Sequence, residues 1–216
     1  MKKKFFKYGW TVGGSFAFGQ TKISGEALRN ATDKIEMDGT YSYLAGIFVN
    51  PYASASVNTR FTTGYDYSQK PKIAKAGFWD PVYVMQSCGG GISLGKIFKT
   101  RLGFALKETF TRRHRQYSDD PKTPEQERAK WETGIESRSD LSANLAKEMT
   151  YVSKLELFSA FEHIDVADVK WEHLVTAKVA KYVTMKLELQ IYYDRDVTAK
   201  TQVKQALTVG LTYPFM

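Results

Sequence analysis

The sequence predicts an all-β fold, a single antiparallel transmembrane β-barrel of about ten strands. The first observation is strict alternation of apolar and polar residues in segments of about ten residues, the length that crosses a bilayer at a tilt. The second is that long loops and short turns alternate between these segments. The third is that mean hydropathy is −0.39 and no stretch approaches 18 apolar residues, which excludes a transmembrane helix.

The first half of the chain supplies five alternating segments. In the fourth, three consecutive glycines predict a kink or a bulge. Asn50-Pro51 predicts a tight turn between the second and third segments. The five segments are Trp10 to Phe18, Ile35 to Val49, Ala53 to Phe61, Val82 to Leu94 and Leu102 to Phe110.

The second half supplies five more segments, and no segment in either half has helical periodicity. The last segment alternates most strictly, with apolar residues at Leu207, Val209 and Leu211. The five segments are Thr133 to Leu145, Tyr151 to Phe161, Val169 to Val179, Val183 to Ile191 and Leu207 to Phe215.

The connections predict which end of the barrel faces which side of the membrane. Long loops lie outside an outer-membrane barrel and short turns lie in the periplasm. An even number of strands therefore places both termini in the periplasm, with residues 1–8 as an extension and 9–216 as the barrel domain. Long or moderate loops are expected at 20–33, 66–78, 112–130, 163–168 and 194–201, and short turns at 50–51, 96–99, 147–149 and 180–181.

The face opposite the apolar one carries charges of both signs. In a closed barrel this face is the lumen, where opposite charges can pair. A soluble barrel or sandwich remains the alternative, with the apolar face as its core, because periodicity does not decide which face is outside. The predicted lumen charges are Arg60, Arg101, Glu136, Arg138, Lys154, Glu156, Lys186 and Glu188.

The C-terminal segment has a polar-x-Gly-x-x-aromatic-x-aromatic pattern, carried by Gly210, Tyr213 and Phe215. This pattern resembles the C-terminal signal by which outer-membrane barrels are recognised for assembly. Met216 follows the last aromatic residue, which departs from that signal.

Three stretches resemble a family of Gram-negative outer-membrane proteins that is known only as a domain of unknown function. They are residues 13–24, residues 61–67 and a set of short matches between residues 164 and 196. The resemblance implies an outer-membrane barrel in the bacterial outer membrane. It implies no activity, substrate or catalytic residue.

The net charge of +8 favours a partner with anionic phosphates. Lys and Arg are spread along strands and loops, and neither a basic helix nor an RNA-binding aromatic motif is present, so nucleic acid is not expected. Arg112, Arg113 and Arg115 lie together with His114 in the longest loop. They can hold lipopolysaccharide phosphates or an acidic partner protein, although a solvated loop is the simpler reading.

Acidic residues gather near two loops that follow adjacent hairpins, at Asp165, Asp168, Asp194 and Asp196. Their oxygens can bind Ca²⁺ weakly. With His163 nearby, an aspartate pair can also activate water, as in ten-stranded outer-membrane proteases. The alternative is that aspartates favour turns. No cofactor is expected, and the single Cys88 excludes an intrachain disulfide.

These observations favour a non-enzymatic barrel with a structural or interaction role, including that of a subunit in a larger envelope assembly. A narrow ion or small-solute channel is the first alternative, and a rim hydrolase or calcium-binding barrel is the second. The basic start at residues 1–7 resembles that of an export signal, but no apolar segment follows it.

Overall fold

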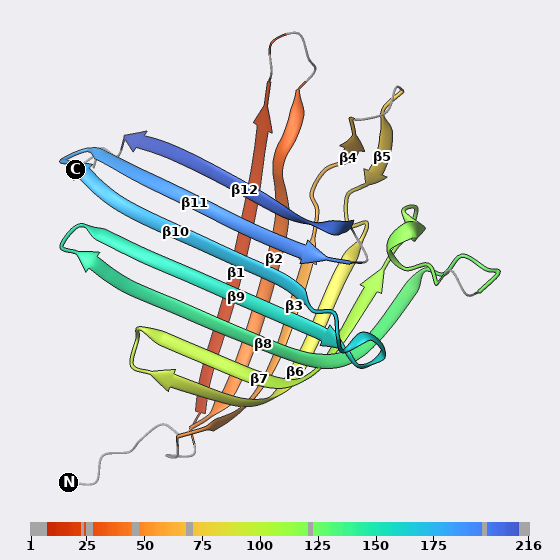
Figure 1. The fold of residues 1–216 in the computed structure, drawn as a ribbon, viewed down its shortest axis with the longest axis horizontal. Coiled ribbons are helices and arrows are strands. Elements are labelled where there is room, and N and C mark those ends of the chain that lie inside the picture. The colour runs from red at the N-terminus through yellow and green to blue at the C-terminus, as the bar shows by residue number, and fades with distance from the viewer. Residues whose placement is uncertain are drawn as a thin grey trace. The chain divides into compact units, whose positions relative to one another are not determined.

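The computed structural model describes residues 8–22, 24, 28–44, 48–67, 71–120, 123–195 and 198–211. The fold is all-β, as the alternation predicted (Figure 1). Twelve strands and two three-residue 3-10 helices, η1 (Arg115–Tyr117) and η2 (Phe161–His163), are present in these ranges. Within them, no helix is long and apolar enough to cross a membrane.

Ten strands form one sheet, in the order β1-β2-β3-β6-β7-β8-β9-β10-β11-β12. The pairs from β8 to β12 are antiparallel, as are β1–β2 and β2–β3. The strands are β1 (Tyr8–Thr21), β2 (Arg29–Tyr43), β3 (Asn50–Thr59), β6 (Val82–Leu94), β7 (Phe98–Phe110), β8 (Ala129–Ala146), β9 (Met149–Ala160), β10 (Asp168–Ala180), β11 (Val183–Asp194) and β12 (Thr198–Leu211).

Two features of the predicted barrel need correction. The strand count exceeds the expected ten, because β4 (Gly64–Asp66) and β5 (Ile73–Ala76) form a separate two-stranded sheet. β4 ends where the predicted 66–78 loop begins, and β5 lies within that loop. The large sheet is also not closed: β1 and β12 stand at the two ends of the strand order, and the described residues hold no ladder joining them. Closure depends on a pairing between strands most distant in sequence, which local alternation does not encode.

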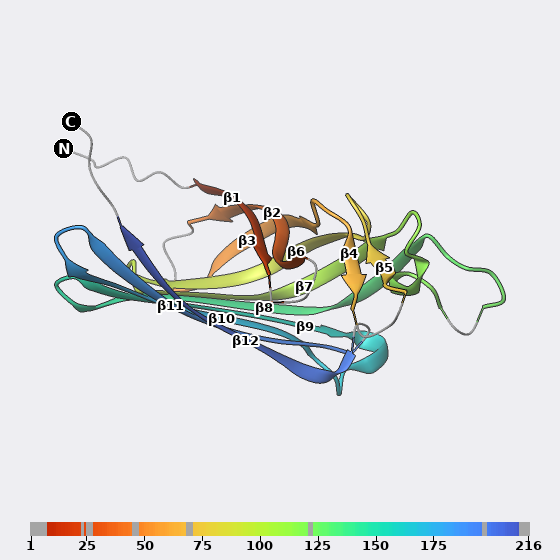
Figure 2. The same ribbon diagram turned by 90° about the horizontal axis from the view of Figure 1, so that it is seen from above.

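The chain divides into two compact units that share several strands. One unit comprises residues 1–44, 52–88 and 105–133, and the other comprises 45–51, 89–104 and 134–216. Within the second unit, β9, β10, β11 and β12 lie side by side in both views (Figures 1 and 2).

The strand boundaries follow the sequence alternation, with a few shifts. Asn50-Pro51 begins β3 and does not form the predicted turn. The predicted 112–130 loop is shorter, because β8 begins at Ala129, and it contains η1. The three glycines at 89–91 do not interrupt β6: a Cβ at Gly89 would meet the backbone at Leu102 and Gly103, so the glycine permits close approach of β7.

Burial in the described residues is inverted relative to an ordinary soluble core. Four hydrophobic residues are buried, namely Tyr52, Ala76, Ala105 and Phe158, whereas ten polar or charged residues are buried. Large hydrophobic side chains are exposed along most strands, including Trp10 at 75% and Leu211 at 83%. In soluble domains Lys and Glu are almost never fully buried unless paired, so the polar side of this sheet requires internal partners.

Candidate functional site

The polar face of β8 to β12 carries two cross-strand rows of alternating charge. Register places Arg138, Glu156 and Lys170 directly opposite one another on β8, β9 and β10. The next row contains Asp140, Lys154 and Glu172 at the same strands. Signs alternate both across each row and from one row to the next, so every direct neighbour is an opposite charge, which stabilises antiparallel pairs.

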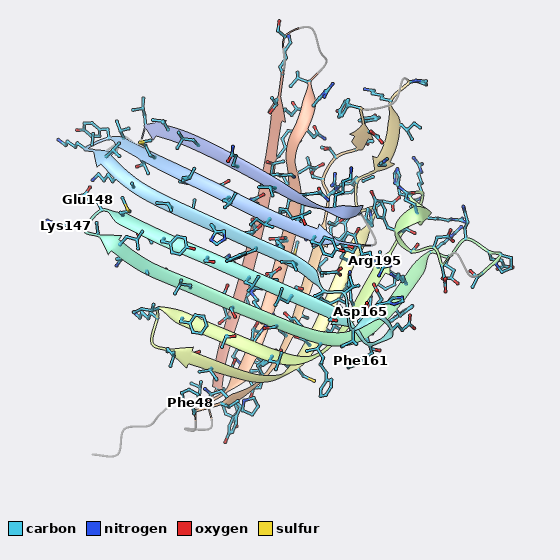
Figure 3. All side chains as sticks on the ribbon, in the orientation of Figure 1. Phe48, Lys147, Glu148, Phe161, Asp165 and Arg195 are labelled. Carbon is cyan, nitrogen blue, oxygen red and sulfur yellow. The ribbon has the colours of Figure 1, made fainter. Side chains whose placement is uncertain are left out.

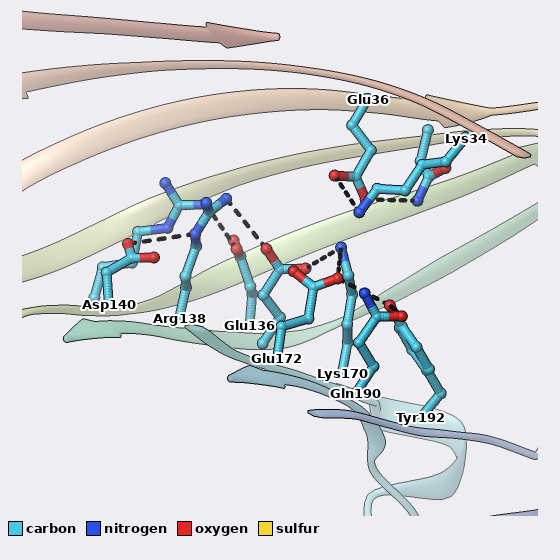
Figure 4. A network of polar contacts seen from close by, with 12 residues as sticks. Lys34, Glu36, Glu136, Arg138, Asp140, Lys170, Glu172, Gln190 and Tyr192 are labelled. Atoms are coloured by element: carbon cyan, nitrogen blue, oxygen red, sulfur yellow. Dashed lines mark hydrogen bonds and ion pairs between the residues drawn. The ribbon is translucent and has the colours of Figure 1, made fainter. Parts of the chain in front are cut away.

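We define the charge lattice as residues 138, 140, 154, 156, 170 and 172. Ion pairs connect all of them except Lys154, which takes its place by register. Figure 4 labels Arg138, Asp140, Lys170 and Glu172 of this set. Arg138 lies 3.3 Å from Glu156 and 3.5 Å from Asp140, measured from guanidinium nitrogen to carboxylate oxygen. Lys170 Nζ lies 3.4 Å from Glu156 and 4.0 Å from Glu172. The Tyr192 hydroxyl extends the network by donating to Glu172 at 2.8 Å. Glu156 therefore bridges three strands.

Arg101 and Glu136 form the most buried ion pair of the predicted lumen set. Arg101 on β7 donates to Glu136 Oε1 at 2.8 Å, and the two side chains are 16% and 6% exposed. The other oxygen of Glu136, Oε2, is buried with no hydrogen-bond partner among the described residues. Glu136 stands opposite Phe158 in register. The charge is thus compensated from one side only.

The remaining predicted lumen charges have different positions. Lys186 and Glu188 share the polar face on β11, where they stand opposite Thr176 and Leu174. Arg60 is exposed and follows the end of β3, so it belongs to a loop. The residues of this set on β8 to β11 therefore occupy register positions on one face of the sheet, whereas the identity of that face as a lumen stays a prediction.

The opposite face of the same strands is apolar and exposed. On β12 the exposed large hydrophobic side chains are Val203, Leu207, Val209 and Leu211, and Leu187 and Val179 continue the face on β11 and β10. The polar residues of β12 between 200 and 208 are exposed as well. Figure 3 places Lys147 and Glu148 at the turn end of these strands and Phe161 and Asp165 at the loop end. The exposed apolar surface lies along the strands between these two ends.

In the other unit, aromatic residues gather at both ends of the apolar face of β1 and β2. At the turn end Trp10 packs on Tyr41 with ring centroids 4.5 Å apart, and Tyr8 packs on both Tyr41 and Tyr43. Smaller residues follow along the strands. At the loop end Phe16 contacts Phe61 edge to face, and further aromatic contacts continue from Phe61 to Phe78 and Trp79.

Asp80 forms a hydrogen-bonded anchor that the sequence did not reveal. Its carboxylate accepts backbone N–H bonds from Arg112, Arg113 and His114 at 3.0, 2.7 and 3.3 Å. His114 Nδ1 lies 3.0 Å from the same carboxylate. Burial raises the pKa of Asp80, but these hydrogen bonds outweigh burial and hold the pKa below its ordinary value. One carboxylate therefore fastens residues 112–114 to the segment before β6.

This anchor determines how the predicted basic cluster is presented. The Arg112 and Arg113 side chains are exposed, while their backbone is held by Asp80. Arg115 is half-buried and donates to the Gln126 carbonyl at 3.4 Å. The loop is ordered further by Ser118, which is fully buried and donates to the Glu127 carbonyl at 2.8 Å. Arg112 and Arg113 are therefore exposed to solvent or a ligand, whereas Arg115 also holds the loop.

The predicted calcium residues are only partly covered by the structure. Asp165 is exposed in the turn after η2, Asp168 begins β10 and Asp194 ends β11, whereas Asp196 lies outside the described residues. In the ranges that are described, no three His, Cys, Asp or Glu side chains are grouped to hold a metal ion. The calcium site stays a prediction.

Of the predicted assembly signal, Gly210 lies in β12 opposite Thr184, and Tyr213 and Phe215 lie outside the described residues. A polar cluster on the apolar face was not predicted. There, the Tyr151 hydroxyl lies 2.7 Å from His173 Nδ1, and Trp171 Nε1 donates to Ser153 at 3.1 Å. A His and a Ser at strand positions otherwise filled by apolar residues are the signal for it.

Two family matches cover most of the chain. Residues 1–65 match a family described as "Protein of unknown function (DUF3078)". Residues 85–215, more than half of the chain, match "Protein of unknown function, DUF481". No curated protein and no solved structure matches significantly. The sheet from β6 to β12, which carries the charge lattice, lies almost wholly within the second match, and the chain belongs to the DUF481 family of proteins.

Proposed function

We propose that this protein is an outer-membrane β-barrel with a structural or interaction role and no enzymatic activity. The observation that carries the proposal is the inverted burial: ion pairs occupy the polar face, and large hydrophobic side chains are exposed on the other. An apolar surface spread over this many strands exceeds what a soluble monomer normally exposes. Acyl chains are a solvent in which this surface is stable.

The spacing of the aromatic residues supports a bilayer. Tyr8 and Phe18 mark the two ends of the apolar face of β1, ten residues apart. Ten residues of antiparallel strand span about 34 Å. At a tilt of about 45°, this length corresponds to about 24 Å of thickness, close to the apolar band of outer-membrane barrels, about 25 Å, which aromatic girdles flank.

The charge lattice favours a structural role over conduction. Ion pairs join Arg138, Glu156 and Lys170 across three strands, so they tie β8, β9 and β10 together. Ten-stranded barrels are also narrow, and side chains fill most of their interior. A barrel of this kind can serve as a scaffold or as a subunit of an envelope assembly. A narrow channel is the competing function, and planar-bilayer recordings distinguish the two.

Membrane fractionation of the native protein, followed by gels of boiled and unboiled samples, tests the proposal. We expect the protein in the outer membrane, with a mobility that shifts on boiling because a folded barrel resists detergent. A soluble protein without the shift would make the apolar face part of a soluble interface, and the proposal would be abandoned. Discrete conductance steps from the purified protein would instead favour the channel.

A further inference from the structure

We propose that Arg112 and Arg113 bind the phosphate groups of lipid A, the membrane anchor of lipopolysaccharide, beside an aromatic surface formed by Phe61, Phe78 and Trp79. This inference rests on the proposed function and deepens it. All of these residues belong to the unit made of residues 1–44, 52–88 and 105–133. Three features of that unit support it: an anchor, two exposed cations and an exposed aromatic surface.

The anchor is Asp80, which fixes the backbone beneath the two arginines. Three consecutive N–H groups, those of residues 112, 113 and 114, point at its carboxylate. Asp80 is itself 4% exposed and is joined to Gly77 by backbone bonds in both directions. The backbone N–H groups of 112–114 therefore donate to Asp80, and the side chains of Arg112 and Arg113 are exposed.

Two other acidic side chains of this unit have partners elsewhere. Asp66 pairs with Lys75 at 2.7 Å, and Asp119 accepts the Glu127 N–H at 3.3 Å. The Asp80 carboxylate is occupied by the anchor itself. Arg112 and Arg113 are exposed, and guanidinium groups bind phosphate oxygens through paired, charge-assisted hydrogen bonds. Two adjacent arginines fit a ligand that carries more than one phosphate.

The aromatic surface adjoins the anchor through a single peptide bond, because Trp79 directly precedes Asp80. Phe61, Phe78 and Trp79 are 46%, 61% and 43% exposed and contact one another in series. Amphipathic and aromatic rings of this kind sit at the membrane–water interface. A phosphorylated glycolipid meets both features at once, with phosphates on the arginines and acyl chains against the rings. Free phosphate would use the arginines alone.

The test measures binding of lipid A to the full chain in detergent micelles, by fluorescence titration. We expect the double variant Arg112→Gln/Arg113→Gln to bind about thirtyfold more weakly, as expected for two basic side chains at an anionic surface. Phe78→Ala should also weaken binding, and inorganic phosphate should compete poorly. Arg112→Lys/Arg113→Lys, which keeps the charge but loses the paired geometry, should fall between the wild type and the glutamine variant.

The matched control is Lys96→Gln/Lys147→Gln, which removes the same charge from two exposed turn residues in the other unit. Equal weakening by the control would reduce the effect to net charge and overturn the inference. Unchanged binding by the arginine variant in a protein that still shifts on boiling would overturn the inference but leave the barrel intact. Strong competition by inorganic phosphate would assign the arginines to a free anion, which also contradicts the lipid site.

Discussion

The Asp80 carboxylate links two loops that are separated by about thirty residues in sequence, and its pKa is held low by the N–H groups of 112–114. A carboxylate with a depressed folded pKa stabilises the fold fully above its unfolded pKa of about 3.9, and this stabilisation is lost as pH falls through the folded pKa. Protection of residues 111–128 from hydrogen exchange should therefore hold at pH 5 to 7 and decline below about pH 4.

Asp80→Ala should remove this protection at every pH, at a cost of about 2 kcal/mol for bonds to a charged group. Exchange measured by mass spectrometry, corrected for the intrinsic pH dependence, checks both statements. Asp119→Ala, which loses one longer bond to the Glu127 N–H at 3.3 Å, serves as the control. Equal protection in the wild type and in Asp80→Ala would show that the loop is held by other contacts, such as those of Ser118.

The close contact of Gly134 with the backbone of β9 leads to a second prediction. A Cβ at this position would meet the Ser159 carbonyl oxygen and lie 2.9 Å from Ala160 Cα, both of which are backbone atoms of β9. Gly134→Ala should therefore destabilise the folded form by about 1–3 kcal/mol. Gly39→Ala, where nothing lies within 4 Å, should have little effect. The temperature at which the gel mobility shifts compares the variants, and equal temperatures would contradict the expected clash.

The sequence could not predict the Asp80 anchor, for a physical reason. Its partners are joined by loops, and a contact between two loops leaves no periodic pattern. The run of residues 112–115 was identified by its charge. In the structure, the backbone N–H groups of 112–114 bind the Asp80 carboxylate, and only two of the three arginine side chains are exposed. Composition indicated a basic patch but not which of its arginine side chains are exposed to a ligand.

Strand positions were predictable because burial on one face imposes period-2 alternation. β6, β10 and β11 begin within one residue of their expected positions. The short strands β4 and β5 were missed because three or four residues give too little alternation to recognise. At Asn50-Pro51 the predicted turn is replaced by strand, since Pro is tolerated at the start of a strand and β3 begins at Asn50.

The charge lattice predicts what happens when the sign of the charge at Glu156 is reversed. Glu156→Arg would place three cations side by side on β8, β9 and β10, with Arg138 and Lys170 as neighbours. We expect a loss of about 2 kcal/mol, because a partly buried charge would lose both partners. The triple variant Arg138→Glu/Glu156→Arg/Lys170→Glu restores alternation within the row and should recover part of the loss. Urea midpoints in detergent provide the measurement, and no recovery would exclude pairing along the row.

At the scale of the whole molecule, alternation defined two faces but not which of them is exposed. A strand pattern is the same whether its apolar side meets a core or a bilayer, so the choice depends on how the strands are assembled. The described residues bury Lys107, Glu108 and Glu136 while Val209 and Leu211 are exposed. Burial, which sequence does not report, therefore carries the argument for the proposed membrane setting.

The proposed barrel requires β1 and β12, the two edge strands of the sheet, to pair in the membrane. In a Cys88→Ser background, Val12→Cys on β1 should form a disulfide with one or two of the positions 203, 205, 207 and 209 on β12, each changed to cysteine in turn. Val12→Cys with Leu155→Cys on β9 is the control that should not react. Gel mobility after mild oxidation of membranes reports the cross-link. No cross-link from any β12 position would mean an open sheet in the membrane.

The charge lattice also bears on how the sheet is assembled without errors. A slip of two residues between β9 and β10 would keep every side chain on its proper face but would set Lys170 against Lys154, or Glu172 against Glu156. The same slip between β8 and β9 would set Arg138 against Lys154, or Asp140 against Glu156. Apolar contacts barely distinguish these arrangements, whereas the charges penalise them. The charge lattice thus favours the observed register over registers shifted by two residues, at a point where the apolar pattern alone permits both.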